Sequence, residues 1–509
     1  MELFLTPEQM RQADRKAIEG YAIPSPLLME NAARSTFEYI AELFQDVPSV
    51  FSILVVCGSG NNGGDGFALA RHLNDFFMVD VLWIGKEEKM SSETHTNYQI
   101  CKSIGMNIRH IPDTDSLDEI DWNYDCIIDA MIGVGGSENI RGIANDILKI
   151  LNNLPAFKIA VDAPTGLNTL TGKAGENCFR ADLTVTMYAK KVGQVIGDGP
   201  DYCGEIMVAN LGAPYSCVDE LADTFAFDYD DLNLLFPPRK RRSSKFDYGR
   251  LVIIGGSKRF PGAGALAANA AIKSGVGLVE LFSEVLHPQI LPEVICYTDN
   301  QSGNYWQENM DIIKQRCLKA DAILIGPGLG DDNYLLFNEL LEELINDKKV
   351  ILDADAIMLI DKTKKYNDNL IITPHLGEFA RLIGKNRDEI DENPFDICKA
   401  GAEKLNCIIH LKHYPSISSD GHIAFLTLNG NPGMASGGSG DVLAGIVASF
   451  AAMGMSSLTA VALGSFIHAA AGDNYSDAFG EQTLTASDLI EALPFVFGSD
   501  NNEDNNEFE

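Results

Sequence analysis

Residues 431–441 read Asn-Pro-Gly-Met-Ala-Ser-Gly-Gly-Ser-Gly-Asp and stand directly before an apolar run, residues 442–453. Glycine at this density is not held by side-chain packing, but it lets backbone N–H groups approach a ligand closely. The apolar run predicts a helix whose positive end lies at the same point, which makes the loop an anion site. Asp441 stands at its mouth, where a carboxylate is typical of proton transfer from a hydroxyl that attacks a phosphoryl group. The alternative is an ordinary glycine-rich turn with Asp441 as a helix cap.

Composition limits the class of protein. The 509 residues exceed what one core holds, which predicts two or three domains. A formal net charge of −33, from 39 basic and 72 acidic residues, argues against nucleic acid as the main partner. No apolar run reaches the length of a membrane span, and residues 1–15 lack a signal-peptide pattern. We therefore expect a soluble, cytoplasmic enzyme with no membrane partner. The ten cysteines include no Cys-x-x-Cys motif and predict buried, reduced thiols.

Short β-branched runs alternate with helical patterns along the whole chain, and many runs end in Gly or Asp. This alternation predicts an α/β fold with parallel sheets covered on both faces. Ligands in such folds bind beyond the carboxyl ends of the strands. The expected strands are residues 53–57, 79–84, 126–129, 158–162, 183–188 and 205–209, then 250–254, 278–282, 322–325, 350–352, 370–372 and 407–411.

The boundary between the domains is expected between about Pro214 and Lys245. Residues 237–245, Pro-Pro-Arg-Lys-Arg-Arg-Ser-Ser-Lys, interrupt helix and strand alike. Their basic run is typical of a solvated linker, with a nuclear-localisation or phosphate-binding patch as the alternative. The last ten residues hold five acids and no base, which predicts a disordered tail. The expected division is 1–222, a linker 223–245, a second domain 246–495 and an acidic tail 496–509.

The first set of candidate site residues follows three strands of the N-terminal half. Residues 58–66, Gly-Ser-Gly-Asn-Asn-Gly-Gly-Asp-Gly, contain a G-x-G-x-x-G string, which alone is a weak dinucleotide fingerprint. Adjacent strand ends can bring Asn62, Asp129 and Thr165 together, and their oxygens suit an alkali or alkaline-earth cation rather than zinc. Asp162 ends another strand, and Lys190 and Lys191 follow the next. A carboxylate and a lysine in one cleft suit proton exchange beside an iminium or carbonyl, while capping or turn formation is the alternative for each residue taken singly.

The strings Asn-Asn-Gly-Gly-Asp-Gly at 61–66 and Val-Asp-Ala-Pro-Thr-Gly at 161–166 resemble those of the NAD(P)H-hydrate epimerase domain, over roughly residues 1–220. The resemblance implies a Rossmann-like three-layer fold that interconverts the R and S forms of NAD(P)H hydrated at C6. It makes Asp162 a substrate contact and the acid/base, with Lys191 assisting, and assigns potassium to Asn62, Asp129 and Thr165. Val134 departs from the Gly-Thr-Gly-type loop that is usual there. The implied substrate contacts also include Asn61, Asn62, Gly63, Gly64, Asp65, Gly133, Val134, Gly135, Gly136, Ser137, Glu138 and Asn139.

The C-terminal half carries further motifs at expected strand ends. They are Gly255-Gly256-Ser257, Gly262-Ala263-Gly264-Ala265, Gly326-Pro327-Gly328-Leu329-Gly330, Asp353-Ala354-Asp355, Thr373-Pro374-His375 and Lys412. With residues 437–441 they resemble the ribokinase-like superfamily, and more closely the ADP-dependent NAD(P)H-hydrate dehydratase, over about 240–495. One fused chain would then both epimerise and dehydrate.

This second resemblance implies a route through phosphorylation of the C6 hydroxyl, with Asp441 as the base and the N–H groups of residues 438–440 holding the phosphate. Asp353 and Asp355 could bind Mg²⁺, and a cap or turn is the alternative. His375 has an alternative as a packed strand-end histidine. The implied contacts with the hydrate are Ala265, Gly330, His375 and Asp441, and those with the adenine nucleotide are Lys412, His413, Tyr414, Pro415, Ser416, Gly438, Ser439 and Gly440.

The combined expectation is repair of hydrated NAD(P)H, with K⁺ in the first domain, Mg²⁺ in the second and ADP as co-substrate. NADHX and NADPHX would be the substrates, and we expect a homo-oligomer. A vitamin or sugar kinase with a regulatory Rossmann-like domain is the alternative enzyme, recognisable by a phosphorylated product that accumulates. A non-catalytic NAD-binding or scaffold protein is a third possibility, against which Asp162, Lys191 and Asp441 argue.

Overall fold

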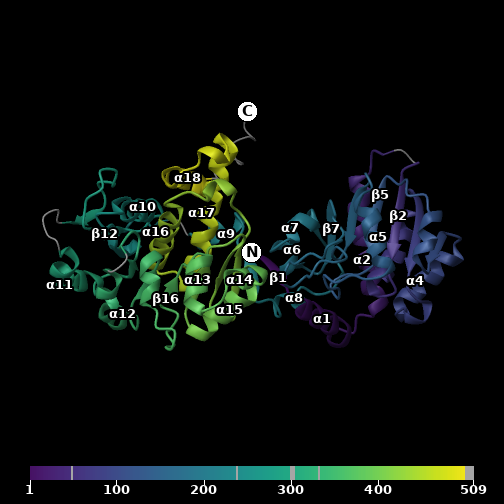
Figure 1. The fold of residues 1–509 in the computed structure, drawn as a ribbon, viewed down its shortest axis with the longest axis horizontal. Coiled ribbons are helices and arrows are strands. Elements are labelled where there is room, and N and C mark those ends of the chain that lie inside the picture. Colours follow the sequence, from purple (N-terminus) through teal and green to yellow (C-terminus); the bar gives the residue numbers. More distant parts are fainter. Residues whose placement is uncertain (48–49, 237–238, 299–303, 331–332, 499–509) are drawn as a thin grey trace. The chain divides into compact units, whose positions relative to one another are not determined.

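The computed structural model describes residues 1–47, 50–236, 239–298, 304–330 and 333–498. The chain forms two compact units (Figure 1). The N-terminal unit is residues 3–224, and the C-terminal unit is residues 225–509 together with residues 1–2.

The N-terminal unit is built on a seven-stranded sheet of order β4-β3-β2-β5-β6-β7-β9, in which all neighbours are parallel. Alternate residues of β2 face opposite layers: Leu54 and Val56 share a core with α5, whereas Val55 and Cys57 lie under α3. A Cβ on Gly66 of α3 would lie 2.5 Å from the Cβ of Ala130, so glycine lets this helix sit close to the sheet. The elements of this half are β1 (Glu2–Leu5), α1 (Pro7–Arg15), α2 (Ser25–Leu43), β2 (Ser52–Cys57), α3 (Asn61–Leu73), β3 (Met78–Ile84), α4 (Ser92–Ser103), β4 (Asn107–Ile111), β5 (Cys126–Ala130), α5 (Ile143–Asn152), β6 (Phe157–Val161), β7 (Leu183–Met187), β8 (Lys190–Lys191), α6 (Val192–Val195), α7 (Gly199–Cys203), β9 (Glu205–Ala209) and α8 (Ser216–Asp219).

The C-terminal unit has strands in the order β13-β12-β11-β14-β15-β16-β17-β18-β19. The strands β13 to β17 are parallel, and β18 and β19 continue the sheet in antiparallel pairing. One face of the sheet shares a large apolar core with α10, α16, α17 and α18. The elements are β10 (Thr224–Ala226), α9 (Asp230–Leu235), β11 (Arg250–Ile254), α10 (Pro261–Lys273), β12 (Leu278–Phe282), β13 (Ile295–Tyr297), α11 (Tyr305–Cys317), β14 (Ala322–Ile325), α12 (Asn338–Leu344), β15 (Lys349–Leu352), β16 (Leu370–Ile372), α13 (Leu376–Ile383), α14 (Arg387–Glu392), α15 (Pro394–Leu405), β17 (Ile408–Leu411), β18 (Ser416–Ser419), β19 (Ala424–Thr427), α16 (Ser439–Ala452), α17 (Ser457–Phe479) and α18 (Ala486–Gly498).

The α/β class expected from the sequence is confirmed, and each of the twelve expected strands corresponds to an observed one within one residue at either end. One of these differences in strand ends affects the site: β6 ends at Val161 rather than at residue 162, so Asp162 is the first residue beyond the strand. The short strands β1, β4, β8, β10, β13, β18 and β19 were not expected, because their sequences carry too little β-branched pattern to stand out from loops.

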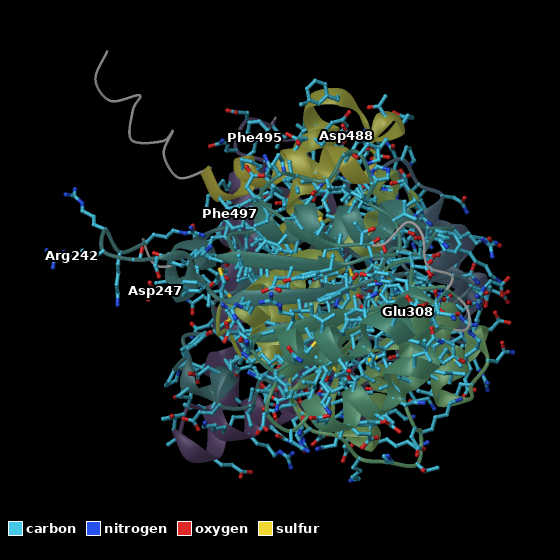
Figure 2. All side chains as sticks on the ribbon, turned by 90° about the vertical axis from the view of Figure 1, so that its left-hand side faces the viewer. Arg242, Asp247, Glu308, Asp488, Phe495 and Phe497 are labelled. Carbon is cyan, nitrogen blue, oxygen red and sulfur yellow. The ribbon has the colours of Figure 1, made fainter. Side chains whose placement is uncertain are left out.

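Residues 223–245 were expected to form a linker, but most of this segment is packed into the C-terminal unit. Phe227 and Leu232 belong to its main core, and the ring of Phe236 lies 5.0 Å from that of Phe450. The basic residues that follow in the sequence, 239–245, are exposed, and Figure 2 shows Arg242 and Asp247 on a segment that projects away from this unit. Pro237, Pro238 and the expected disordered residues 500–509 lie outside the described residues.

The structure can be compared with the sequence expectations for the cysteines and for long apolar helices. All ten cysteines are free thiols, and all but Cys296 are buried, as expected. Within the described ranges, no helix combines the length and the apolarity needed to cross a bilayer.

Two fragments that begin at different residues test where the C-terminal unit begins. We expect a fragment 225–509 to melt cooperatively and a fragment 244–509 to melt at a clearly lower temperature. The shorter fragment lacks Phe227 and Leu232, whose burial contributes about 1.5–3 kcal/mol each. Circular dichroism melts of the two fragments provide the measurement, and equal melting temperatures would show that residues 225–243 are a linker after all.

Candidate active sites

A cavity of about 680 Å³ opens at the carboxyl edge of the N-terminal sheet. Its wall is made by the segments that follow β2, β3, β5 and β6, together with α1 and α2. Two glycines after β2 are required by the close packing of the loop. A Cβ on Gly58 would lie 2.1 Å from the carbonyl oxygen of Met131, and a Cβ on Gly63 would lie 1.9 Å from the carbonyl oxygen of Gly58. The expected site residues that line this cavity are Asn61, Asn62, Asp65, Gly133, Val134, Gly135 and Asp162.

Asp162 and Lys191 form a buried ion pair at this cavity. Lys191 Nζ lies 2.7 Å from Asp162 Oδ1, and the lysine side chain has no exposed surface. The other carboxylate oxygen of Asp162 accepts a hydrogen bond from the backbone N–H of Val134, at 3.1 Å. Asp162 has a left-handed backbone, with φ of 66°, which is uncommon for a residue with a side chain and is typical of functional positions. The structure thus selects Lys191 rather than the half-buried Lys190 as the partner of this carboxylate.

Two further carboxyl groups, Asp14 on α1 and Asp65 on α3, line the same cavity. Burial raises the pKa of Asp65 well above its usual range, and the charges of Asp162 and Asp14 add to the effect. The pKa of Asp14 is also raised, mainly by burial. Asp14 was not among the expected site residues, since an acid on an amphipathic helix carries no sequence signal that separates it from a surface residue.

The three residues expected to hold a cation are only partly brought together. Asp129 is fully buried and accepts hydrogen bonds from the backbone N–H and the hydroxyl of Thr165, at 2.7 and 2.8 Å. Burial raises the pKa of Asp129 to about 6. The side-chain amide of Asn62 is buried with no hydrogen-bond partner among the described residues, and it lies against Gly133 beside Asp162. An unpartnered amide oxygen and a buried carboxylate are donors that suit a potassium ion.

The remaining expected contacts of the N-terminal site lie around the cavity rather than on its wall. Gly63 and Gly64 are buried inside α3. Ser137 and Asn139 are exposed, and Glu138 Oε2 accepts a hydrogen bond from Asn168 at 3.2 Å.

The second site is at the N-terminus of α16, where the glycine-rich loop becomes a helix. Gly438 is the N-cap with φ of 93°, and a Cβ there would lie 2.6 Å from a methyl carbon of Leu266. Ser439, Gly440 and Asp441 form the first turn; the N–H of Ser439 donates to the carbonyl of Ser436 at 3.3 Å, and the N–H groups of Gly440 and Asp441 have no partner within the helix. The Ser439 hydroxyl lies 3.2 Å from Nε2 of the buried His468 on α17, a contact that the sequence did not suggest.

A lysine and two carboxylates meet beside this helix end. Lys412 Nζ lies 2.8 Å from Asp353 Oδ1, which also accepts a hydrogen bond from Thr373 at 2.7 Å. A Cβ on Gly440 would lie 3.3 Å from the same Nζ, so the ammonium faces the first turn of α16. Burial raises the pKa of Asp441 to about 7; the charge of Asp353 adds to this rise and Lys412 opposes it. Asp441 therefore changes its protonation state near neutral pH.

Other expected residues of the second site have identifiable contacts. His375 pairs in parallel with Lys412, and its Nδ1 accepts hydrogen bonds from Gly377 and Glu378 as the N-cap of α13. Gly330 donates its N–H to Asp355 at 3.0 Å. Ala265 lies on a separate cavity of about 390 Å³ between α10 and α18. The segment after Lys412 turns back on itself: Pro415 follows a cis peptide bond, and the Ser416 hydroxyl donates to the carbonyl of His413. The Nε2 atom of His413 lies 2.8 Å from Asp391, and Tyr414 is exposed.

Comparison with known proteins gives consistent matches for both halves. The family described as YjeF-related protein N-terminus matches residues 25–193, and the family described as NAD(P)H-hydrate dehydratase matches residues 251–495. A relative from Moorella thermoacetica, named bifunctional NAD(P)H-hydrate repair enzyme Nnr, is 33% identical over 97% of this chain and 96% of its own length. A relative of the same name from Dictyoglomus turgidum is 32% identical over 97% of this chain and 98% of its own length. A solved Bacillus subtilis ADP/ATP-dependent NAD(P)H-hydrate dehydratase, co-crystallised with ATP/Mg²⁺, is 27% identical, covers 54% of this chain and 98% of its own, and has a TM-score of 0.47.

Replacing one lysine at a time separates the roles of Lys191 and Lys190. We expect Lys191→Met to lower the free energy of unfolding of the N-terminal unit by about 3–5 kcal/mol, because it leaves the Asp162 charge buried without its partner. Lys190→Met, at the half-buried neighbour, is the matched control and should cost much less. Denaturant unfolding of both variants is the measurement. A cost for Lys190→Met as large as that for Lys191→Met would contradict the assignment of the buried pair.

Proposed function

The chain belongs to the family of bifunctional NAD(P)H-hydrate repair enzymes, and from this premise we propose a separate reaction for each of its two units. The N-terminal unit interconverts the R and S forms of hydrated NAD(P)H, and the C-terminal unit dehydrates the S form to NAD(P)H at the expense of ADP. We assign the epimerase to residues 1–222 and the dehydratase to residues 246–495. Action in the cytoplasm and a homo-oligomeric state remain predictions from the sequence.

The observation that carries this proposal is the presence of one carboxylate–lysine arrangement in each unit. Asp162 pairs with Lys191 in the first, and Asp441 stands beside Lys412 and Asp353 in the second. The lysine of the first pair is fully buried and directed at Asp162, whereas the lysine of the second faces the first turn of α16, where a cation and a helix N-terminus meet. The two arrangements therefore suit different chemistry, proton exchange in one and phosphoryl transfer in the other.

In the dehydratase unit, Asp441 is placed to accept the proton of the C6 hydroxyl as that oxygen attacks the terminal phosphorus of ADP. The N–H groups at the start of α16 hold the transferred phosphoryl oxygens, and Lys412 offsets their charge. The phosphate then leaves with the C6–O electron pair while the ring nitrogen supplies its lone pair, and loss of a proton restores the dihydropyridine. Lys412 is kept in position by Asp353 and Thr373.

Magnesium is proposed to accompany the nucleotide. Asp353 Oδ1 is engaged by Lys412 and Thr373, Asp355 accepts the N–H of Gly330, and no cluster of three acidic, histidine or cysteine ligands exists in the part of the chain that the structure describes. These residues fit an ion that is held mainly by substrate phosphates and water, which is common for Mg²⁺. Such an ion would supply charge neutralisation at the phosphates.

In the epimerase unit, we propose that Asp162 exchanges protons with the substrate and that Lys191, 2.7 Å from its Oδ1, keeps it oriented. Potassium is proposed near Asn62, Asp129 and Thr165, supported by the unpartnered amide of Asn62 and the buried Asp129 carboxyl. A bound cation there would offset the negative charge that burial otherwise disfavours.

Replacing the two proposed bases should separate the two activities. We expect Asp441→Asn to reduce dehydration of pure S hydrate by about 10²–10⁴-fold and to leave R/S interconversion unchanged, and Asp162→Asn to do the reverse. In the native protein, dehydration should increase as the pH rises through about 7, because Asp441 must be ionised to act as a base. Recovery of near-ultraviolet NADH absorbance and chiral chromatography of the hydrate pool provide the measurements. Near-native dehydration by Asp441→Asn would reject its role, and a phosphorylated product that accumulates would favour the kinase alternative.

The glycine loop gives a test of nucleotide binding. We expect Gly440→Val to weaken ADP binding severely, because a side chain there meets Lys412 Nζ and obstructs the N–H groups of the first helical turn. Gly437→Ala is the matched control, since a Cβ at that position meets nothing within 4 Å. Calorimetric titration with ADP and ATP compares the three proteins, and we expect ADP to serve better. Equal ADP affinity in Gly440→Val and the native protein would place the phosphates elsewhere.

A further inference from the structure

One face of helix α17 carries small and polar residues although residues 460–472 of this helix are all buried. Their spacing, by three residues and by one in turn, places them on the same side of the helix. They are Ser465, His468, Ala469, Gly472 and Asp473. Buried polar groups need hydrogen-bond partners, and here the partners come from residues 427–439, the connection between β19 and α16 that contains the glycine-rich loop.

Asp473 binds the start of this connection. Its Oδ2 accepts the backbone N–H of Gly430 at 2.8 Å, and its Oδ1 accepts the side-chain amide of Asn431 at 2.9 Å. The side-chain oxygen of Asn431 in turn accepts the N–H of Gly433 at 3.1 Å. One carboxylate on α17 therefore fixes the backbone where the loop begins.

Gly472 lets the middle of the loop lie directly on the helix. A Cβ at this position would lie 2.6 Å from Sδ of Met434, so a larger residue would displace the methionine. A Cβ on Gly430 would lie 3.6 Å from the Cβ of Ala469, which is ordinary contact between the loop and the same face of α17. The small residues of this face thus match the path of the loop.

His468 binds the other end of the loop, where the chain enters α16. Its Nε2 lies 3.2 Å from the hydroxyl oxygen of Ser439, the first residue of α16, and both side chains are buried. Burial, assisted by the charge of Lys412, lowers the pKa of His468 to about 4. The imidazole is therefore uncharged at neutral pH and adds no positive charge for a phosphate. Its contribution is the position of Ser439.

Ser439 has the only side chain in the sequence Gly437-Gly438-Ser439-Gly440. Glycines on both sides give this backbone a freedom that no packing of their own removes, and a Cβ on Gly437 would meet nothing within 4 Å. The turn can therefore be fixed through a side chain only at Ser439, and the partner of that side chain is His468.

We propose that His468 is a positioning residue for dehydration: by binding Ser439 it fixes the turn whose N–H groups hold the transferred phosphoryl group. Asp473 does the same for the start of the loop, so one face of α17 serves as the template for the whole anion site. The inference rests on the dehydratase function proposed above. N–H donors stabilise a transferred group only where they are correctly placed, and a displacement of about 1 Å costs about 10²-fold in rate.

The test uses the full chain with pure S hydrate and ADP, and it measures kcat, the KM for ADP and the melting temperature. Ser439→Ala and His468→Leu each remove one partner of the contact, and each should lower kcat by about 10²-fold. The KM for ADP should rise less than kcat falls, because the turn holds the phosphoryl group most tightly during its transfer. The double variant should be no slower than either single variant, since both changes break one contact.

Two further variants separate positioning from stability. His468→Gln keeps a side-chain amide that can bind the Ser439 hydroxyl, so it should recover most of the rate that His468→Leu loses. Ser449→Ala is the matched control, because it makes the same change in the same helix. The hydroxyl of Ser449 is buried and accepts the N–H of Val276 at 3.2 Å, ten residues beyond Ser439. This control should lower the melting temperature and leave kcat and KM native.

The outcomes separate the inference from the function on which it rests. A native kcat in Ser439→Ala would overturn the role of His468, and so would losses that add up in the double variant. A loss in His468→Leu that changes with pH would also overturn it, because it would show that the imidazole carries a proton. If His468→Leu fails to fold, Ser439→Ala decides by itself. A native chain that does not convert S hydrate to NADH with ADP would instead reject the dehydratase function.

Discussion

A lysine ammonium held against a buried carboxylate that follows a parallel strand is the interaction on which both sites depend. Lys191 and Asp162 form it in one unit, and Lys412 and Asp353 form it in the other, at 2.7 and 2.8 Å. A charge that is removed from water is costly unless it is paired and hydrogen-bonded, so each pair must be surrounded by further polar partners. Thr186 and Thr373 supply them, and these hydroxyls are buried as a consequence.

The two lysine–carboxylate pairs differ in what the lysine offers to the other carboxyl groups nearby. In the N-terminal unit the lysine is fully used by Asp162 and by oxygens behind it, so Asp14 and Asp65 share the cavity with no cation of their own. In the C-terminal unit the lysine lies between Asp353 and the first turn of α16, and Asp441 titrates near neutral pH. In the functions proposed above, the same kind of pair serves proton exchange in one unit and deprotonation of a hydroxyl in the other.

Close helix packing brings the second site to its place. Gly445 on α16 leaves room for α10, since a Cβ there would lie 2.2 Å from the carbonyl oxygen of Ala267. The rest of α16 is apolar on all sides and buried among the sheet, α10 and α17. This close packing fixes where α16 lies, and its first turn comes beside the ammonium of Lys412.

The sequence by itself determined the parallel α/β class, the positions of the main strands, the polar residues at their carboxyl ends and the glycine-rich loop before α16, because each of these depends on local pattern and on the backbone freedom of glycine. It left Lys190 and Lys191 undivided, it was silent on Asp14 and His468, and it named Thr373 without a partner. Only the tertiary structure decided these points. Burial and pairing of a charged or hydroxyl group depend on which distant segments close over it, and in a sheet of parallel strands those segments come from far along the chain. The same reason explains residues 225–245, whose sequence is typical of a linker although Phe227 and Leu232 complete the core of the second unit.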